Sequence, residues 1–355
     1  MKLEKNHWLS NAYLVFVFAV LYAPIFYLIY YSFNSGGGMN DFQSFTLEHY
    51  KAVLGDTRLI GIVIDTLILA LLSALCATII GTLGAIMIDF IRSNRRKQFV
   101  LGMNNILLVS PDVIIGASLL ILFTFIGFKL GFWSVLLSHI AFNIPIVVLM
   151  VLPKLTEMNR SMITAARDLG ATSSQVLTRI ILPSITPGIL SGFFMAFTYS
   201  LDDFAVTFFV TGNGFSTIAV EIYSRARQGI SLQINALSTL MFLFSLILVI
   251  GYYFIQQYQA KRLMMFVGAI LVASFGLLLF RKNFETAIAG NSDTIIVYNW
   301  GDYIDPNLIT QFEEETGYKV IYETFDSNEA MYTKIKQGGT NYDVAIPSEY
   351  AIHKM

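Results

Sequence analysis

The stretch Ser161–Gly188, SMITAARDLGATSSQVLTRIILPSITPG, separates two long apolar segments of the chain. With its flanks it makes a connection of roughly thirty residues, whereas links between neighbouring helices usually have about 2 to 8 residues. Gly170 suits the helix C-cap position that needs a positive φ, and Pro183 is expected to close a second helical pattern that opens at Ser173. The stretch therefore predicts a helix, a glycine turn and a second helix, with a task beyond that of a link.

The rest of the chain has the composition of a membrane protein. Hydrophobic residues make up 55% of the sequence and charged residues 13%, and the mean hydropathy is +0.63. A soluble domain carries about 25% charged residues. Acidic residues gather after residue 284, while apolar runs fill most of the chain before it, so two regions with different solvents are expected.

Several apolar segments are long enough to cross a bilayer, whose core is about 30 Å thick and needs roughly 20 apolar residues in a helix. Six segments meet this length and a seventh is shorter: 12–32, 61–88, 106–127, 132–152, 188–210, 235–255 and 264–280. Gly81, Thr82 and Gly84 in the second segment are typical of helices that pack closely in lipid. We therefore expect an all-α polytopic membrane protein with six core transmembrane helices and a seventh anchor helix.

The distribution of Lys and Arg predicts the orientation. With the N-terminus inside, the inner segments hold twelve of these residues and the outer loops up to the sixth span hold five, so the positive-inside rule places the N-terminus in the cytoplasm. The seventh span would deliver residues 283–355 outside, and the first of the two helices around Gly170 would lie across the inner membrane face. The inner residues are Lys2, Lys5, Arg92, Arg95, Arg96, Lys97, Lys154, Arg160, Arg167, Arg179, Lys261 and Arg262, and the outer ones are Lys51, Arg58, Lys129, Arg225 and Arg227.

Within residues 160–183 the sequence resembles the cytoplasmic coupling loop of the permeases of ABC importers. That loop reads Glu-Ala-Ala, three residues, Gly, nine residues, Ile, one residue and Leu-Pro, and every spacing matches here. The resemblance implies that the loop docks in a groove of a cytoplasmic ATPase and transmits ATP-driven closure to the membrane helices. An ordinary amphipathic interfacial helix is the alternative. The matching positions are Thr164, Ala165, Ala166, Gly170, Ile180, Leu182 and Pro183, with Thr164 in place of the usual Glu.

Three carboxylates are expected at membrane depth, where a charged side chain is unfavourable and usually faces a pathway or a cavity. Asp112 follows Pro111 at the mouth of the third span, and Asp202 and Asp203 lie within the fifth. Anionic side chains along a translocation pathway would suit a cationic cargo. A structural role stays open as the alternative, because these carboxylates could instead cap a broken helix or bond to nearby hydroxyl groups.

Other polar residues of the spans are interpreted as packed side chains or as residues near the membrane surface. His139 in the fourth span, with Asn143 close by in the sequence, is interpreted as a packed polar residue rather than a ligand. Asp65 and Asp89 lie near span ends, where contact with water or lipid headgroups is expected. Cys76 is the one cysteine of the chain, so a disulfide framework and a cysteine-based metal site are excluded.

Three segments resemble a narrower family. PDVIIGASLLILF at 111–123, GFWSVLLSHIAFNIP at 131–145 and SLDDFAVTFFVTG at 200–212 are similar to the permease of spermidine/putrescine importers, and the similarity runs through most of residues 10–260. The resemblance implies a polyamine cargo, without a preference between spermidine and putrescine. A permease for another cationic or small organic solute, or an ion-coupled secondary transporter, is the alternative.

A different kind of sequence begins near residue 261. A basic pair, a short apolar run and a polar segment with small residues look like a secretory signal displaced into the middle of a chain, which the fusion of two proteins would explain. The basic flank after the run makes a poor cleavage site and favours a retained anchor. The expected domains are a permease domain over 1–260, an anchor helix over 261–283 and an outer domain over 284–355.

The outer segment alternates between strand and helix patterns, which predicts a βαβαβ unit with a parallel sheet. Some seventy residues cannot bury a two-lobed core. Residues 284–355 are therefore expected to form a partial α/β lobe, truncated before its second half. The expected strands and helices are, in order, Thr294–Trp300, Pro306–Thr316, Lys319–Thr324, Ser327–Gln337 and Asp343–Ile346.

Ligands of open parallel sheets bind beyond the carboxyl ends of the strands, and aromatic rings stand next to carboxylates there. This combination suits an ammonium group, although an aromatic ring at a strand end can also be only a plug of the core. YNWGDYID, FDSNEAMYTKIKQGG and YDVAIPSEY resemble the N-terminal lobe of periplasmic polyamine-binding proteins. By that resemblance the polyamine-contacting positions are Trp300, Gly301, Tyr303, Ser348 and Tyr350, with the strand-end carboxylates Asp302 and Glu349 beside them.

The sequence carries no motif of enzyme chemistry: it has no Gly-x-x-x-x-Gly-Lys phosphate loop, no nucleophile elbow and no His/Cys metal spacing. We therefore expect a transporter subunit rather than an enzyme, with no catalytic residue, metal or cofactor of its own. ATP and Mg would belong to a partner ATPase. The expected partners are cytoplasmic ATPase subunits, a second permease subunit, a polyamine and the lipid bilayer, without nucleic acid, and the expected location is the plasma or inner membrane.

Overall fold

A computed structural model shows the fold of the chain. The structure describes residues 7–212, 215–228, 232–256, 294–300, 303–325, 328, 331–332, 335 and 342–352. The predicted anchor helix over 261–283 lies outside these residues. The chain divides into two compact units, one made of Met1–Ile60 with Ile222–Gly251 and the other of Gly61–Glu221 with Tyr252–Met355.

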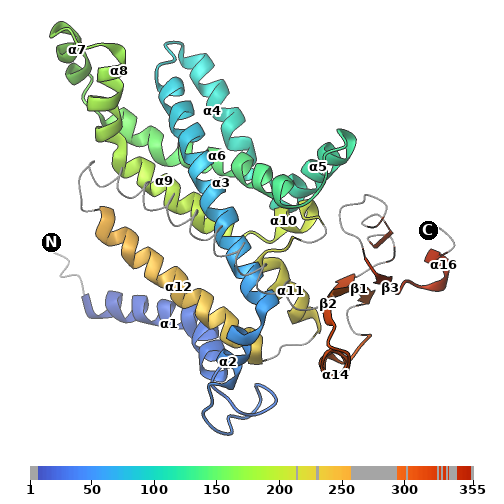
Figure 1. Ribbon diagram of the computed structural model, residues 1–355. Helices are drawn as coiled ribbons and strands as arrows, with labels where there is room; N and C mark the ends of the chain where they lie inside the picture. Colours follow the sequence, from blue (N-terminus) through green and yellow to red (C-terminus); the bar gives the residue numbers. More distant parts are fainter. Residues whose placement is uncertain are drawn as a thin grey trace. The chain divides into compact units, whose positions relative to one another are not determined.

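The first unit is helical (Figure 1). It contains α1 (His7–Tyr31), α2 (Glu48–Gly55) and most of α12 (Leu232–Gln256), and α11 (Ile218–Gln228) enters it at its C-terminal part. Val53 of α2 and Leu237 of α12 are buried in a shared apolar cluster. Arg225 of α11 also bonds to Asp56, with 3.0 Å between the guanidinium nitrogen and the carboxylate oxygen.

The second unit contains six helices that pack around a common core or beside it. They are α3 (Thr57–Asp89), which begins in the first unit, α4 (Asn94–Val109), α5 (Asp112–Phe125), α6 (Phe132–Glu157), α9 (Leu182–Asp202) and α10 (Ala205–Val210). Their core brings together residues far apart in the sequence, among them Leu69 of α3, Val135 of α6 and Val206 of α10. These apolar side chains make one hydrophobic cluster, so α3, α5, α6 and α10 form a packed bundle.

Small residues let α3 and α9 approach α6 closely. A Cβ atom added to Gly188 of α9 would lie 2.9 Å from the Met150 carbonyl oxygen, and one added to Gly192 would lie 3.2 Å from Val147. A Cβ atom at Gly81 of α3 would lie 2.7 Å from the same Val147. Close packing through glycine is typical of helices in membranes, and the expectation for segment 61–88 is confirmed.

Four helices within the described ranges are long and apolar enough to cross a membrane, or up to five if one bent pair counts as a single span. The spans predicted at 12–32, 61–88 and 132–152 correspond to α1, α3 and α6. In α12, Leu232–Leu246 is a shorter apolar helix. The chain is therefore mostly helical with several apolar helices, as its composition predicts.

Two of the predicted spans are not continuous helices. The segment 106–127 is broken between α4 and α5, which are bent by 101°. Pro111 explains the break, because it disfavours a helical backbone at the preceding residue, and Ser110 is extended with φ −70° and ψ 136°. The segment 188–210 is broken at Asp203, whose ψ of 119° separates α9 from α10.

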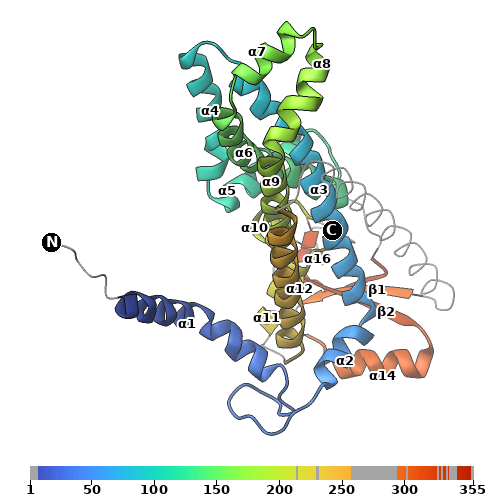
Figure 2. The ribbon, with the colours of Figure 1, turned by 90° about the vertical axis from the view of Figure 1, so that its left-hand side faces the viewer.

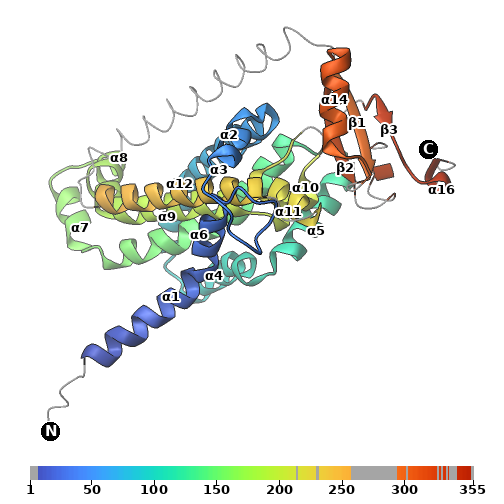
Figure 3. The same ribbon diagram turned by 90° about the horizontal axis from the view of Figure 1, so that it is seen from below.

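The C-terminal part contains a small parallel sheet in the strand order β2-β1-β3. The strands are β1 (Thr294–Trp300), β2 (Lys319–Phe325) and β3 (Val344–Ala345), with helices α14 (Pro306–Thr316) and α16 (Glu349–Ile352). Figure 3 shows α14 running beside the sheet. The predicted strand-and-helix order and the parallel pairing are confirmed where the structure describes them. The helix predicted at Ser327–Gln337 lies largely outside the described residues.

Candidate functional site

Helices α7 (Ser161–Asp168) and α8 (Ser173–Val176) form a helical hairpin at one end of the α6 and α9 helices (Figures 1 and 2). Gly170 has a φ of +83° at the turn. The Ala171 N–H donates to the Ala166 carbonyl oxygen at 2.9 Å, and the Gly170 N–H donates to that of Arg167 at 2.9 Å. These two bonds are those of a Schellman motif, so the predicted glycine turn is confirmed.

The second helix of the hairpin does not end at Pro183, and that prediction was wrong. Thr172 and Gln175 form a capping box that starts α8, and the helix continues through the π-helical turn Leu177–Ile181 into α9. Pro183 lies in the first turn of α9, where in a regular α-helix its ring would clash with a carbonyl group of the preceding turn. The wider π turn before it accommodates the ring. The second helix of the hairpin is therefore continuous with α9.

The predicted coupling residues fall into two groups. Thr164, Ala165 and Gly170 are exposed on the hairpin and Pro183 is exposed on α9, whereas Ala166, Ile180 and Leu182 are partly buried. Ile163, Val176 and Ile181 are buried, so they stabilise the hairpin from inside. The Leu169 side chain is 89% exposed at the turn, and the sequence interpretation missed it. An apolar residue beside the turn glycine was the signal that could have identified it.

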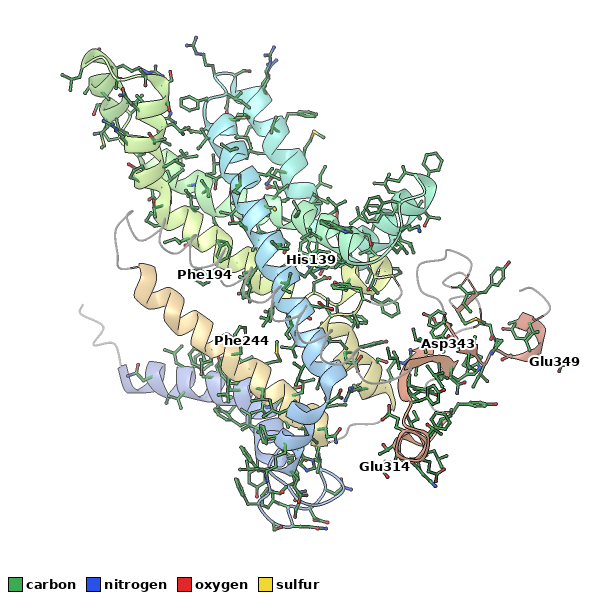
Figure 4. The ribbon with its side chains drawn as sticks, in the orientation of Figure 1. His139, Phe194, Phe244, Glu314, Asp343 and Glu349 are labelled. Carbon is green, nitrogen blue, oxygen red and sulfur yellow. The ribbon has the colours of Figure 1, made fainter. Side chains whose placement is uncertain are left out.

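His139 of α6, which is labelled in Figure 4, is buried in a cluster with other polar side chains. One ring nitrogen, Nδ1, lies 2.5 Å from Ser200 Oγ, and the other, Nε2, lies 2.9 Å from Thr207 Oγ1. Ser200 Oγ is also 2.8 Å from Ser73 Oγ of α3. His139 is thus a packed polar residue that joins α3, α6, α9 and α10, as the sequence indicated.

Asp203 belongs to the same cluster and is buried. Its carboxylate accepts hydrogen bonds from the Thr207 N–H at 2.8 Å, from the Thr207 hydroxyl at 2.8 Å and from the Val206 N–H at 3.3 Å. Its Oδ2 atom lies 3.5 Å from His139 Nε2. Asp203 therefore satisfies the first turn of α10, as an N-terminal cap does, and the alternative of a structural role describes its geometry.

Asp112 and Asp202 lie in a different environment from Asp203. The Tyr199 hydroxyl donates to both Asp112 carboxylate oxygens, at 3.1 and 3.3 Å. Tyr199 precedes Asp202 by three residues on α9, and residues so spaced are neighbours on a helix surface. Asp202 and Tyr199 are exposed and Asp112 is partly so. The three form an acidic and aromatic face, here called the acidic face.

The predicted ligand positions of the lobe are only partly brought together. Trp300 packs on Phe325, with ring centroids 4.7 Å apart, so it contributes to the core. Burial raises the pKa of the Tyr322 hydroxyl, which donates to the Trp300 carbonyl oxygen at 3.2 Å. Tyr303 is exposed. Gly301 and Asp302 lie outside the described residues.

The other end of the lobe site is organised by Asn328, which the sequence interpretation did not select. Its amide nitrogen donates to the Tyr350 hydroxyl at 2.9 Å, and its amide oxygen accepts from the Ser348 N–H at 3.0 Å. Glu349, which is labelled in Figure 4, is exposed. Within the described residues, no group of three or more His, Cys, Asp or Glu side chains could hold a metal ion.

Comparisons with known proteins show one family for the larger part of the chain. The family model described as "Binding-protein-dependent transport system inner membrane component" matches residues 77–281. The Spermidine/putrescine transport system permease protein PotC of Escherichia coli (strain K12) is 38% identical over 253 residues, which are 71% of this chain and 96% of that protein. The Putrescine transport system permease protein PotI of the same strain is 36% identical over 231 residues, 63% and 82% of the two chains. A solved chain of a bacterial ABC transporter involved in the import of alginate shares the fold, with a TM-score of 0.57, 20% identity, and coverage of 71% and 96%.

Proposed function

The chain belongs to the family of binding-protein-dependent transport system inner membrane components, and on that premise we propose that it is the permease subunit of an ATP-driven polyamine importer. As a permease it is a transporter subunit of a multi-pass inner-membrane system and not an enzyme. The observation that carries the cargo proposal is the 38% identity to a spermidine/putrescine permease along 96% of that protein.

The acidic face supports the same cargo by its chemistry. Spermidine and putrescine are flexible amines that are positively charged at neutral pH. Carboxylates offer them ion pairs, and the ring of Tyr199 offers a cation–π contact. Asp112 and Asp202 keep part of their surface free beside that ring. Asp203 contributes less, because its oxygens already accept bonds from Thr207 and Val206.

The hairpin supports docking of a separate cytoplasmic ATPase. Its exposed residues Thr164, Ala165 and Gly170 and the exposed Leu169 would present a small, partly apolar surface to a groove. The burial of Ile163 and Val176 would keep that surface rigid. ATP and Mg would bind to the partner, and a second permease subunit would complete the membrane part.

The cargo is tested by uptake of labelled spermidine in cells that lack their own polyamine uptake and express this chain with its ATPase and second permease. We expect ATP-dependent accumulation that excess unlabelled putrescine reduces and excess neutral amino acid does not. Accumulation that persists when the ATPase is inactivated would favour an ion-coupled secondary transporter. Accumulation that neither polyamine reduces would instead favour another solute.

The segment over 284–355 is proposed to be a tethered part of an outer polyamine-binding domain. The parallel sheet and the aromatic strand ends support this, together with the resemblance of the three sequence segments quoted above. The proposed orientation puts this segment outside and the hairpin inside. The proposal predicts opposite labelling by a membrane-impermeant maleimide of single cysteines in a Cys76→Ala background.

For this topology test we choose Ser173→Cys on the hairpin and Glu349→Cys on the lobe, because both positions are exposed. In intact cells position 349 should react and position 173 should react only after the membrane is permeabilised. Reaction at 173 without permeabilisation, or none at 349, would reverse the proposed orientation. The Cys76→Ala protein without an added cysteine measures the background.

A further inference from the structure

Asp89 is a buried carboxylate at the C-terminal end of α3, and cations from two other segments reach it. Its side chain is 2% exposed and forms an ion pair with Arg160, which directly precedes α7 of the hairpin. Lys97 in the first turns of α4 contributes its ammonium group at 3.5 Å from the second carboxylate oxygen. The expectation that Asp89 touches water or headgroups was therefore wrong, because the chain brings Arg160 into contact with this carboxylate.

The position of Asp89 makes these cations necessary. A negative charge at a helix C-terminus is unfavourable because the helix dipole is also negative there. A buried charge that loses its partner is strongly destabilising. The Asp89 oxygen that faces Lys97 has no hydrogen bond within the described residues, so this carboxylate depends on Arg160 and Lys97.

The two sides of the ion pair differ in exposure. The Arg160 side chain is 51% exposed, while that of Asp89 is 2% exposed. Arg160 thus belongs to the hairpin end that a partner can reach, and Asp89 belongs to the interior of the membrane bundle. A force on the hairpin would reach α3 through this contact, in addition to reaching α9 through the continuous helix from α8.

We propose that Asp89 is a positioning residue that ties the hairpin to α3 and α4 through Arg160 and Lys97, so that nucleotide-driven movement of the hairpin also moves α3. The inference rests on the proposed function only in assuming that an ATPase docks on the hairpin. It adds a second mechanical connection that the coupling-loop residues do not include. Its geometry does not depend on which cargo is carried.

Cys76 supplies a reporter for this connection, because it lies on α3 and is partly exposed. The measurement is the rate at which Cys76 reacts with N-ethylmaleimide in the assembled permease–ATPase complex, with and without ATP and Mg. Label on this chain is separated from label on the partners by gel. We expect nucleotide to change the wild-type rate by about fivefold or more, the lower end of typical coupling between sites.

The variants are Asp89→Asn, which removes the charge, and the double change Asp89→Asn with Arg160→Gln. Replacing both partners removes the unpaired buried charge and its destabilisation, so the double variant should assemble even if the single one does not. We expect the nucleotide-dependent change in Cys76 reactivity to fall to less than twofold in both. The control is Glu157→Gln, which breaks an exposed ion pair to Lys154 close by in the chain and should leave the response unchanged.

A wild-type complex without a nucleotide response, or a double variant with the wild-type response, would overturn this inference. A merely structural ion pair predicts the latter result, because the double variant restores stability. Spermidine uptake is measured in parallel. If wild-type uptake is absent while Cys76 still responds to nucleotide in the manner described, the cargo proposal fails and the connection through Asp89 stands.

Discussion

Replacing Gly170 by Glu should abolish import while the protein remains in the membrane. Gly170 has a φ of +83°, a conformation that costs a residue with a Cβ atom roughly 1 to 2 kcal/mol. Its surroundings are open, with no atom within 4 Å of an added Cβ, so the change acts on the turn and the exposed surface and does not disturb a core. The turn sets the angle of α7, and a carboxylate at this tip would face the proposed ATPase groove.

Gly127 provides the matched control. It also has a positive φ, +69°, and open space around an added Cβ atom, so Gly127→Glu introduces comparable strain and the same charge elsewhere. Gly170→Asn is the second control, because Asn tolerates this conformation. We measure membrane content, co-purification with the ATPase and spermidine uptake. Gly170→Glu should lose the last two by at least about tenfold, and the controls should keep most of both. Normal complex and uptake from Gly170→Glu would refute the coupling-loop assignment.

The hairpin was predictable because its signals are local. A glycine suited to the end of a helix and a helical pattern that opens at Ser173 are both signals within a few positions of the chain. The long apolar helices were predictable for a similar reason, since a run of some twenty apolar residues is its own signal. The strand boundaries of the lobe followed from alternation of strand and helix patterns between turn residues.

The breaks inside the predicted spans could not be located by hydropathy. Apolar residues continue on both sides of Pro111 and of Asp203, so the running average does not fall there. Pro111 indicates the first break, because the residue before a proline disfavours a helical backbone. The sequence interpretation used it only to mark the start of the third span. The backbone turns at Asp203 because its side chain accepts the N–H groups of residues 206 and 207, a competition between side chain and helix that the sequence leaves undecided.

The contacts that give the polar residues their roles are distant in sequence. Asp89 and Arg160 are 71 positions apart, and Ser73 and Ser200 are 127 apart. One sequence shows that a carboxylate is present but does not show which cation folds onto it. For this reason Asp89 was assigned to the membrane surface, and Asp202 and Asp203 were treated as a pair although only Asp203 is buried.

Asp202 and Asp203 should respond differently to replacement by Asn. In a span an unpaired carboxylate is disfavoured by about 2.5 kcal/mol or more on insertion scales, and the structure offsets this for Asp203 by bonds from Thr207 and Val206. Asn at position 203 would turn an NH₂ group toward donors, which we expect to destabilise the protein by about 1 to 3 kcal/mol. Asp202 is exposed, so Asn there should leave stability unchanged.

If the acidic face lines the route, Asp202→Asn should reduce spermidine uptake at least about tenfold, which corresponds to about 1.4 kcal/mol, with normal amounts of assembled complex. Asp112→Asn should also reduce spermidine uptake, because Asp112 belongs to the acidic face and accepts hydrogen bonds from Tyr199. Asp203→Asn should instead lower the melting temperature and the yield of protein, with uptake per assembled complex close to that of the wild type. The matched substitutions make the comparison direct, since each removes one charge and keeps the size of the side chain. Wild-type uptake from a double Asp112→Asn and Asp202→Asn variant would show that the acidic face is not on the route, and the cargo proposal would then rest on the similarity to polyamine permeases.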